Sequence, residues 1–258
     1  MKWPIDERFD IEKHTILLGY RGSISHGTYI PSEKEGIDDK DTIGILVPPE
    51  KYIYGLSRFE QIEKKEDEWD TVIYSIQKMF KLLLNANPNV LSLLWINNND
   101  YIKVTDLGRR IIENRDIFVS KQAYHSFSGY AYSKLSGITK NEFKGYMGEK
   151  RKDIVEKVGY DTKNAAHLIR LLRMGYEFLT EGELYVRRKD ASELIDIKLG
   201  RWTLEKVKEV AEKEFTLVKE AYIRSTLPDE PDFEKAEQLC IDIIDTFYKD
   251  GAFPSKRM

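Results

Sequence analysis

The sequence has very few cysteines and almost no net charge, and both features limit what the protein can be. The single cysteine, Cys240, rules out an internal disulfide and a cysteine-rich zinc site. It falls on the apolar face of a predicted helix, so we expect it in the core. Charged residues make up 33% of the 258 residues, yet the net charge is only -3. We therefore expect a surface of mixed sign, on which any basic patch is local.

Long apolar runs and common catalytic signatures are absent too. No run approaches the roughly 20 apolar residues that a membrane helix needs, and the N-terminal stretch lacks the apolar core of a secretion signal. We expect a cytoplasmic protein without a membrane partner. The sequence shows no Ser-His-Asp pattern, Walker loop, zinc-ligand spacing or internal repeat. Its 41% of hydrophobic residues is enough for a normal core.

The first hundred residues mix short apolar runs with turns. The runs "HTILLGY" and "TIGILV", at 14–20 and 42–47, are typical of buried strands, and a third run covers 71–74. Before the third run, a short helix and a charged turn are predicted within 51–70. A helix is predicted from "SIQKMFKLLLNA", at 75–86, and "NPN" ends it.

From about Thr105 onward the apolar periodicity is helical. Asp161, Thr203 and Asp232 are predicted helix N-caps, and Gly182 is a predicted helix stop. We therefore predict an α+β fold, with a small mixed β-sheet and its helices in 1–104. A helical domain in 105–258 is expected to close over the site carried by the sheet.

Acidic residues crowd the start of the second predicted strand. Residues two apart in a strand point the same way, so Asp39 and Asp41 are expected on one face and Lys40 on the other. Asp70, at the start of the third apolar run, adds a carboxylate if the two strands are neighbours. Carboxylates this close need a cation, and Mg²⁺ takes one or two carboxylates while leaving positions for phosphates.

Gly22 and Ser23 follow the first predicted strand. Glycine lets the backbone approach a ligand closely. A helix that starts just after it would offer free N–H groups to phosphates. We therefore expect a phosphate-binding site here that faces the predicted metal-binding carboxylates.

Together these motifs resemble the DNA polymerase beta superfamily of nucleotidyltransferases, and most closely the RNA repair pathway DNA polymerase beta family. The resemblance rests on Gly22-Ser23, Gly27, "DKDTIG" at 39–44, "DTVIYSIQKMFKLLLNANPNVLSLLW" at 70–95 and "HLIRLL" at 167–172. The segment "SEKEG", at 32–36, reads as an insertion relative to that family.

The resemblance implies a two-metal transfer of a nucleoside monophosphate from a nucleoside triphosphate to an acceptor hydroxyl, with release of pyrophosphate. Asp39, Asp41 and Asp70 would be the catalytic metal ligands for two Mg²⁺ ions, with Mn²⁺ as an alternative. Gly22 and Ser23 would hold the β- and γ-phosphates. RNA ends are the favoured acceptor, and a protein side chain or a small molecule stays open.

Further residues are candidates for nucleotide contact. Ser25 and His26 lie in the predicted phosphate loop, and Lys78 lies on the helix after the third strand. His167 and Arg170 are three residues apart on one helix face, and Lys163 precedes His167 by one turn. For each of them the alternative is an ordinary surface, packing or polar interdomain role.

Other interpretations of the aspartates remain open from the sequence. An EF-hand-like calcium register would use Asp39, Asp41, Gly44, Leu46 and Glu50, although Pro48-Pro49 fall where its exiting helix should begin. An isolated acidic turn is a second alternative, and for Asp70 a capping carboxylate is another. The competing function is a non-catalytic nucleotide- or RNA-binding protein that retains the fold.

Overall fold

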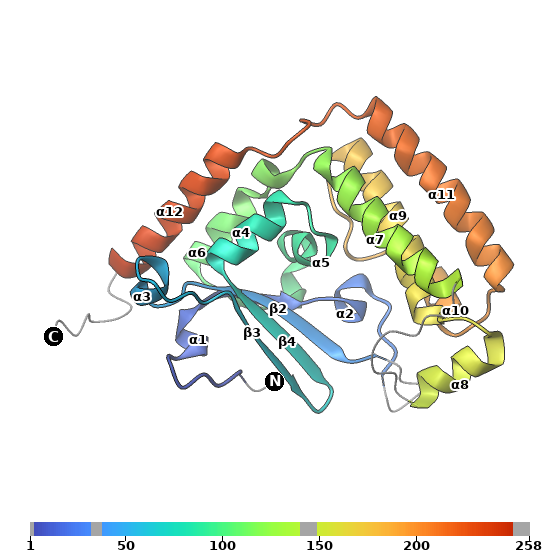
Figure 1. The fold of residues 1–258 in the computed structure, drawn as a ribbon, viewed down its shortest axis with the longest axis horizontal. Helices are drawn as coiled ribbons and strands as arrows, with labels where there is room; N and C mark the ends of the chain where they lie inside the picture. Colours follow the sequence, from blue (N-terminus) through green and yellow to red (C-terminus); the bar gives the residue numbers. More distant parts are fainter. Residues whose placement is uncertain (1–2, 32–37, 140–148, 250–258) are drawn as a thin grey trace.

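The computed structural model describes residues 3–31, 38–139 and 149–249 (Figure 1). The expected insertion at 32–36 lies outside these residues. Five strands form one mixed sheet in the order β3-β4-β2-β1-β5. Within it, β2 and β4 are parallel and the other neighbouring pairs are antiparallel. The strands are β1 (Thr15–Tyr20), β2 (Lys40–Leu46), β3 (Gln61–Glu66), β4 (Trp69–Ser75) and β5 (Tyr101–Val104).

The α+β fold class is confirmed, but two strands differ from the sequence prediction. The charged stretch predicted as a turn forms the edge strand β3, whose residues Gln61, Glu63 and Lys65 are exposed while the intervening ones are half-buried. An edge strand with one solvent-exposed face needs no continuous apolar run, so its composition resembles that of a turn. The short strand β5, with one exposed and three half-buried residues, was missed for the same reason.

The sheet separates two hydrophobic clusters. Ile43, Ile45 and Val72 point to the larger cluster, which the helices complete. Leu46 and Ile73 point to a smaller cluster on the opposite face. Because alternate residues of a strand face opposite ways, this assigns the side chains of Asp41 and Asp70 to the helix-covered face.

The helices begin and end where polar caps and glycines allow. The predicted caps Asp161 and Thr203 accept backbone N–H groups, Asp232 accepts the N–H of Lys235, and Gly182 ends its helix with φ 72°. The helices are α1 (Ile11–His14), α2 (Ser23–His26), α3 (Glu50–Ile53), α4 (Ile76–Leu84), α5 (Pro88–Leu91), α6 (Asp106–Glu113), α7 (Gln122–Thr139), α8 (Glu149–Val158), α9 (Thr162–Glu181), α10 (Ala191–Lys198), α11 (Leu204–Arg224) and α12 (Phe233–Lys249), with 3₁₀ turns η1 (Ser92–Trp95), η2 (Asn98–Asp100) and η3 (Arg115–Phe118). Among the described residues, no helix combines the length and apolar character needed to span a bilayer.

Helix α12, from the end of the described chain, packs with the first half. In Figure 1, α12 lies beside α4 and α6, while α7, α9 and α11 form a bundle on the other side of the molecule. The ring of Phe247 in α12 is 5.6 Å from that of His14, and the Tyr248 hydroxyl donates to the carbonyl of Pro48. Both halves contribute to the larger cluster, and the boundary at 104/105 stays a prediction.

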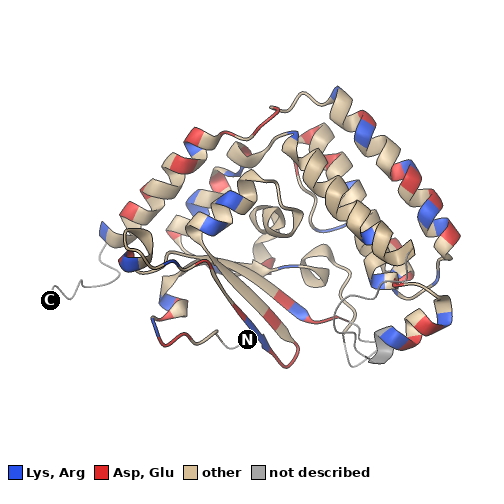
Figure 2. Ribbon diagram, viewed as in Figure 1, with Lys and Arg blue, Asp and Glu red and all other residues tan. Residues whose placement is uncertain are grey.

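The surface carries charges of both signs. Figure 2 shows Lys and Arg alternating with Asp and Glu along α11 and α12, as the small net charge predicts. Cys240 of α12 is half-buried and packs against the larger cluster, and burial raises the pKa of its thiol to about 12.

Candidate active site

Three carboxylates meet at one end of the sheet. Asp41 of β2 lies directly opposite Asp70 of β4 in the parallel register, and Asp39 precedes β2. The negative charges of Asp70 and Asp39 both act on Asp41. The juxtaposition depends on β2 and β4 being neighbours, although β3 separates them in the chain. The calcium-loop interpretation is wrong, because Lys40–Leu46 is a strand.

The ionised form of Asp41 is unfavourable in the folded protein. Burial raises the pKa of Asp41 to about 6; Arg21 and Lys163 lower it, whereas Asp70 and Asp39 raise it further. A carboxylate with this pKa gains stability from any additional cation beside it.

Two cations balance the other carboxylates. Lys65 Nζ lies 3.1 Å from Asp39 Oδ2, and Arg21 Nη2 lies 3.7 Å from Asp70 Oδ1. In the part of the chain that the structure describes, no three His, Cys, Asp or Glu side chains are arranged to hold one metal ion. The donors nevertheless have the chemistry that a hard divalent cation prefers, because all three are carboxylates and Asp41 and Asp70 lie opposite each other on adjacent strands.

The loop after β1 lies against this cluster. Gly22 has φ 65°, a conformation that side chains disfavour, and α2 begins directly after it. A Cβ at Gly22 would lie 2.8 Å from Asp41 Oδ2, so only glycine permits this approach. The backbone N–H of Arg21 donates to the carbonyl of Asp41 over 2.9 Å. Ser25 donates to the Gly22 carbonyl over 3.1 Å, which stabilises the turn.

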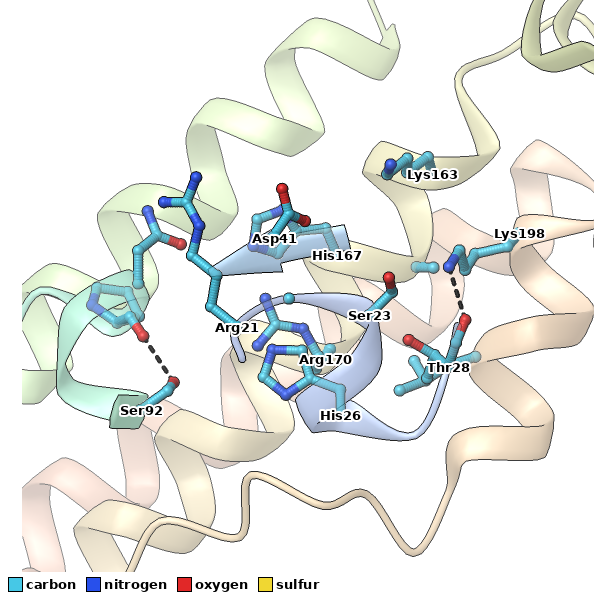
Figure 3. A pocket seen from close by; sticks show the side chains of 15 residues that line it. Arg21, Ser23, His26, Thr28, Asp41, Ser92, Lys163, His167, Arg170 and Lys198 are labelled. Carbon is cyan, nitrogen blue, oxygen red and sulfur yellow. Dashed lines mark hydrogen bonds between the residues drawn. The ribbon is translucent and has the colours of Figure 1, made fainter. Parts of the chain in front are cut away.

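A cavity of about 280 Å³ opens between the carboxylate cluster and the helices (Figure 3). Asp41 and residues of the segment after β1, among them Gly22 and Ser23, line it from the sheet side, and residues of α5, η1, α9 and α10 line the rest. Among the described lining residues Asp41 is the only carboxylate, whereas four are cationic: Arg21, Lys163, Arg170 and Lys198. Three of these cations also pair with carboxylates outside the lining, Arg21 with Asp70 and both lysines with Asp38. The cation-rich lining favours a negatively charged ligand.

Helix α9 contributes one face to the cavity, as the sequence predicts. Lys163, His167 and Arg170 all line it. The Arg170 guanidinium is buried; it donates to Met174 Sδ over 3.0 Å and forms no ion pair with a described carboxylate. Burial and the charge of Arg188 lower the pKa of Arg170 to about 9. A buried arginine that makes no ion pair with a described residue, at the wall of an open cavity, favours an anionic ligand.

The two histidines of the cavity are neutral. Burial holds the pKa values of His26 and His167 well below the usual range, and Arg170 lowers both further. His26 Nδ1 lies 3.0 Å from the carbonyl of Val186, which fixes its ring. His167 Nε2 is buried without a hydrogen-bond partner among the described residues.

Other candidates lie outside the cavity. Lys78 is not among the described residues that line it, and its Nζ lies 3.3 Å from Glu60 Oε2. Ser25 is buried behind the turn.

Sequence reasoning missed several residues of the site. Arg21 adjoins the predicted Gly22 and could have been included on that ground. Asp38 and Lys198 form a buried pair 160 positions apart, and nothing in the sequence indicates it. Lys163, by contrast, lies on the helix face that the sequence indicates, and it lines the cavity.

Comparison with protein families agrees with this geometry. The model of the RNA repair pathway DNA polymerase beta family matches residues 6–249, which is nearly the whole chain. The sequence matches none of the curated proteins with which it was compared. The family indicates a polymerase beta-like nucleotidyltransferase enzyme. The chain belongs to the RNA repair pathway DNA polymerase beta family.

Proposed function

We propose that this protein transfers a nucleoside monophosphate from a nucleoside triphosphate to an acceptor hydroxyl and releases pyrophosphate. One observation carries the proposal. Gly22 approaches the carboxylate of Asp41 beside a cavity lined by four cationic side chains. This arrangement supports a triphosphate site next to the carboxylate cluster, which in-line phosphoryl transfer requires.

The cavity side chains would bind the triphosphate. Gly22 lets the backbone approach the phosphates, and Ser23 offers a hydroxyl donor from the start of α2. Lys163 and Arg170 would neutralise the phosphate charge from the helical side. Arg170 would gain the counter-ion that it lacks among the described residues.

Asp39, Asp41 and Asp70 would hold two divalent ions, Mg²⁺ or alternatively Mn²⁺. Bound there, the ions would neutralise the triphosphate and make the acceptor hydroxyl more acidic. Holding them requires Lys65 and Arg21 to leave Asp39 and Asp70. Both side chains are long and flexible, and the phosphates would attract Arg21.

The oxygen of the acceptor hydroxyl would form a bond to the α-phosphorus. At the same time, the bond from that phosphorus to the oxygen that links it to the β-phosphorus would break, and pyrophosphate would leave. The family description favours RNA as the source of the hydroxyl. A protein side chain and a small molecule are the other two acceptors to be tested.

Transfer of label tests the proposal. Nucleoside triphosphates labelled at the α- or γ-phosphate are incubated with Mg²⁺ or Mn²⁺ and with separate pools of RNA, protein and metabolites. We expect only the α-label to become attached to an acceptor. D39N and D41N should abolish transfer while their melting curves show a folded protein.

Glu63→Gln is the matched control, because Glu63 is an exposed carboxylate on the neighbouring strand β3. It should transfer label at the wild-type rate. Triphosphate binding without α-label transfer to any pool would instead support the non-catalytic nucleotide-binding protein. Transfer by D41N at the wild-type rate would refute the mechanism.

A further inference from the structure

Asp38 differs from the aspartates that follow it because its side chain turns inward. The Asp38 side chain is 0% exposed, whereas that of Asp39 is 47% exposed. Asp38 Oδ2 accepts the backbone N–H of Ile30 over 3.0 Å, which ties together both sides of the loop between β1 and β2. Asp38 is therefore not one of the clustered carboxylates.

Two lysines from different helices converge on this carboxylate. Lys198, at the end of α10, places Nζ 2.5 Å from Asp38 Oδ2 and 2.8 Å from the carbonyl of Thr28. Lys163, in the first turn of α9, places Nζ 3.2 Å from Asp38 Oδ1. Lys163 and Lys198 also line the cavity, so one buried carboxylate joins its sheet side to both helices.

The arrangement fixes cations that would otherwise be mobile. An unrestrained lysine samples many rotamers, and a phosphate that binds it must oppose this entropy. Lys163 also acts electrostatically on Asp41, and it lines the cavity with that residue. A lysine held there presents its ammonium group to the cavity before any ligand arrives.

We propose that Asp38 is a positioning residue of the nucleotide site, which holds Lys163 and Lys198 where they contact the polyphosphate tail of the substrate. The inference rests on the proposed function. It adds a residue that touches no substrate and acts only through the two lysines.

The effect of D38N on anion affinity distinguishes a positioning role of Asp38 from a purely electrostatic one, because the two predict changes of opposite sign. D38N removes a negative charge beside the cavity, and by charge alone it should tighten binding of an anion. Positioning predicts the opposite, a loss of about tenfold in affinity when the lysines lose their anchor. Calorimetric titration with inorganic tripolyphosphate, without divalent metal, measures this independently of catalysis.

A double-mutant cycle tests whether Asp38 acts through Lys163. In a K163M background, D38N should cost much less affinity than in the wild type. The control is D196N, which removes a carboxylate that pairs with Arg201 on the exposed surface of α10. D196N should bind tripolyphosphate like the wild type.

Removing one partner of a buried ion pair can unfold a protein, so D38N is first checked by thermal melting. If D38N does not fold, the double variant D38N/K198M removes both members of the ion pair. The affinity for tripolyphosphate is then compared with and without K163M in that double variant. Equal or tighter binding by the Asp38 variant, or an undiminished loss in the K163M background, overturns the inference alone. A wild type that binds no tripolyphosphate also overturns this inference, whereas the proposed function stands or falls separately on transfer of the α-label.

Discussion

At the scale of single residues, the site depends on an unfavourable negative charge. Asp41 is pressed between Gly22 and two further carboxylates, and burial raises its pKa to about 6. Between pH 3.8 and 6 the folded protein therefore keeps a proton that the unfolded chain has lost. Metal-free stability should fall as pH rises through this window, because the raised pKa favours folding only while Asp41 is protonated.

D41N should remove this pH-dependent cost. We expect D41N to gain on the order of 2 kcal/mol in unfolding free energy over the wild type near pH 7.5, and little near pH 4. Urea denaturation in EDTA at the two pH values measures the difference. A difference that does not change with pH would show that the charge of Asp41 is not destabilised in the folded protein.

The sequence predicted the residues of the site that belong to local motifs. Gly22, Asp41 and the face of α9 with His167 and Arg170 were found because each lies in a contiguous or helically spaced pattern. The pair of Asp38 and Lys198 was not predictable, since it joins positions 160 residues apart. Such pairs depend on how α10 returns to the loop after β1.

At the scale of elements, close packing of α6 on β1 holds the first strand in place. Gly108 lies where a Cβ would be 2.4 Å from the carbonyl oxygen of Ile16, so the helix and the strand are in backbone contact. Helix α6 begins just after the predicted domain boundary, yet it supports the strand that leads to Gly22. The element is thus part of the scaffold of the site.

G108A should therefore destabilise the protein by about 1–3 kcal/mol, the usual cost of forcing extra volume into a packed interior. The control is G129A in α7, where a Cβ would meet nothing within 4 Å. Alanine there should be neutral or stabilise by up to about 1 kcal/mol. Equal effects of the two substitutions in urea denaturation would contradict the close packing.

The element prediction succeeded where burial is high and failed where it is low. The buried runs of β1, β2 and β4 and the capped helices were identified from apolar pattern and capping residues. In β3, half-buried residues such as Ile62 alternate with exposed residues such as Gln61 and Glu63. Because most of these residues are charged, the alternation is not visible as an apolar pattern in the sequence. Edge strands take their stability from the neighbouring strand, so their own composition indicates little.

At the scale of the whole molecule, sheet and helices share one hydrophobic core. Ile43 of β2, Leu168 of α9 and Phe247 of α12 belong to the same buried cluster. The cavity lies between parts that this core joins, and we expect them to unfold together.

F247A should lower the stability of the entire chain by about 3–5 kcal/mol, as for other buried phenylalanines. Circular dichroism and tryptophan fluorescence should report one coincident transition, shifted to lower urea concentration. The control is I241A on the exposed side of the same helix, where Ile241 is 47% exposed, and it should change stability by less than about 0.5 kcal/mol. Two separate transitions, of which F247A moves only one, would contradict a shared core.

The central claim is that the carboxylates at the ends of β2 and β4 and the cationic cavity form one site for a metal-bound triphosphate. Its most direct test is the affinity for non-hydrolysable nucleoside triphosphates, measured by calorimetry with Mg²⁺ and with EDTA for the wild type and D41N. The account predicts that Mg²⁺ tightens binding by at least about tenfold in the wild type and has no such effect in D41N. Equal affinity of the wild type with Mg²⁺ and with EDTA, or an equal Mg²⁺ effect in D41N, would contradict it.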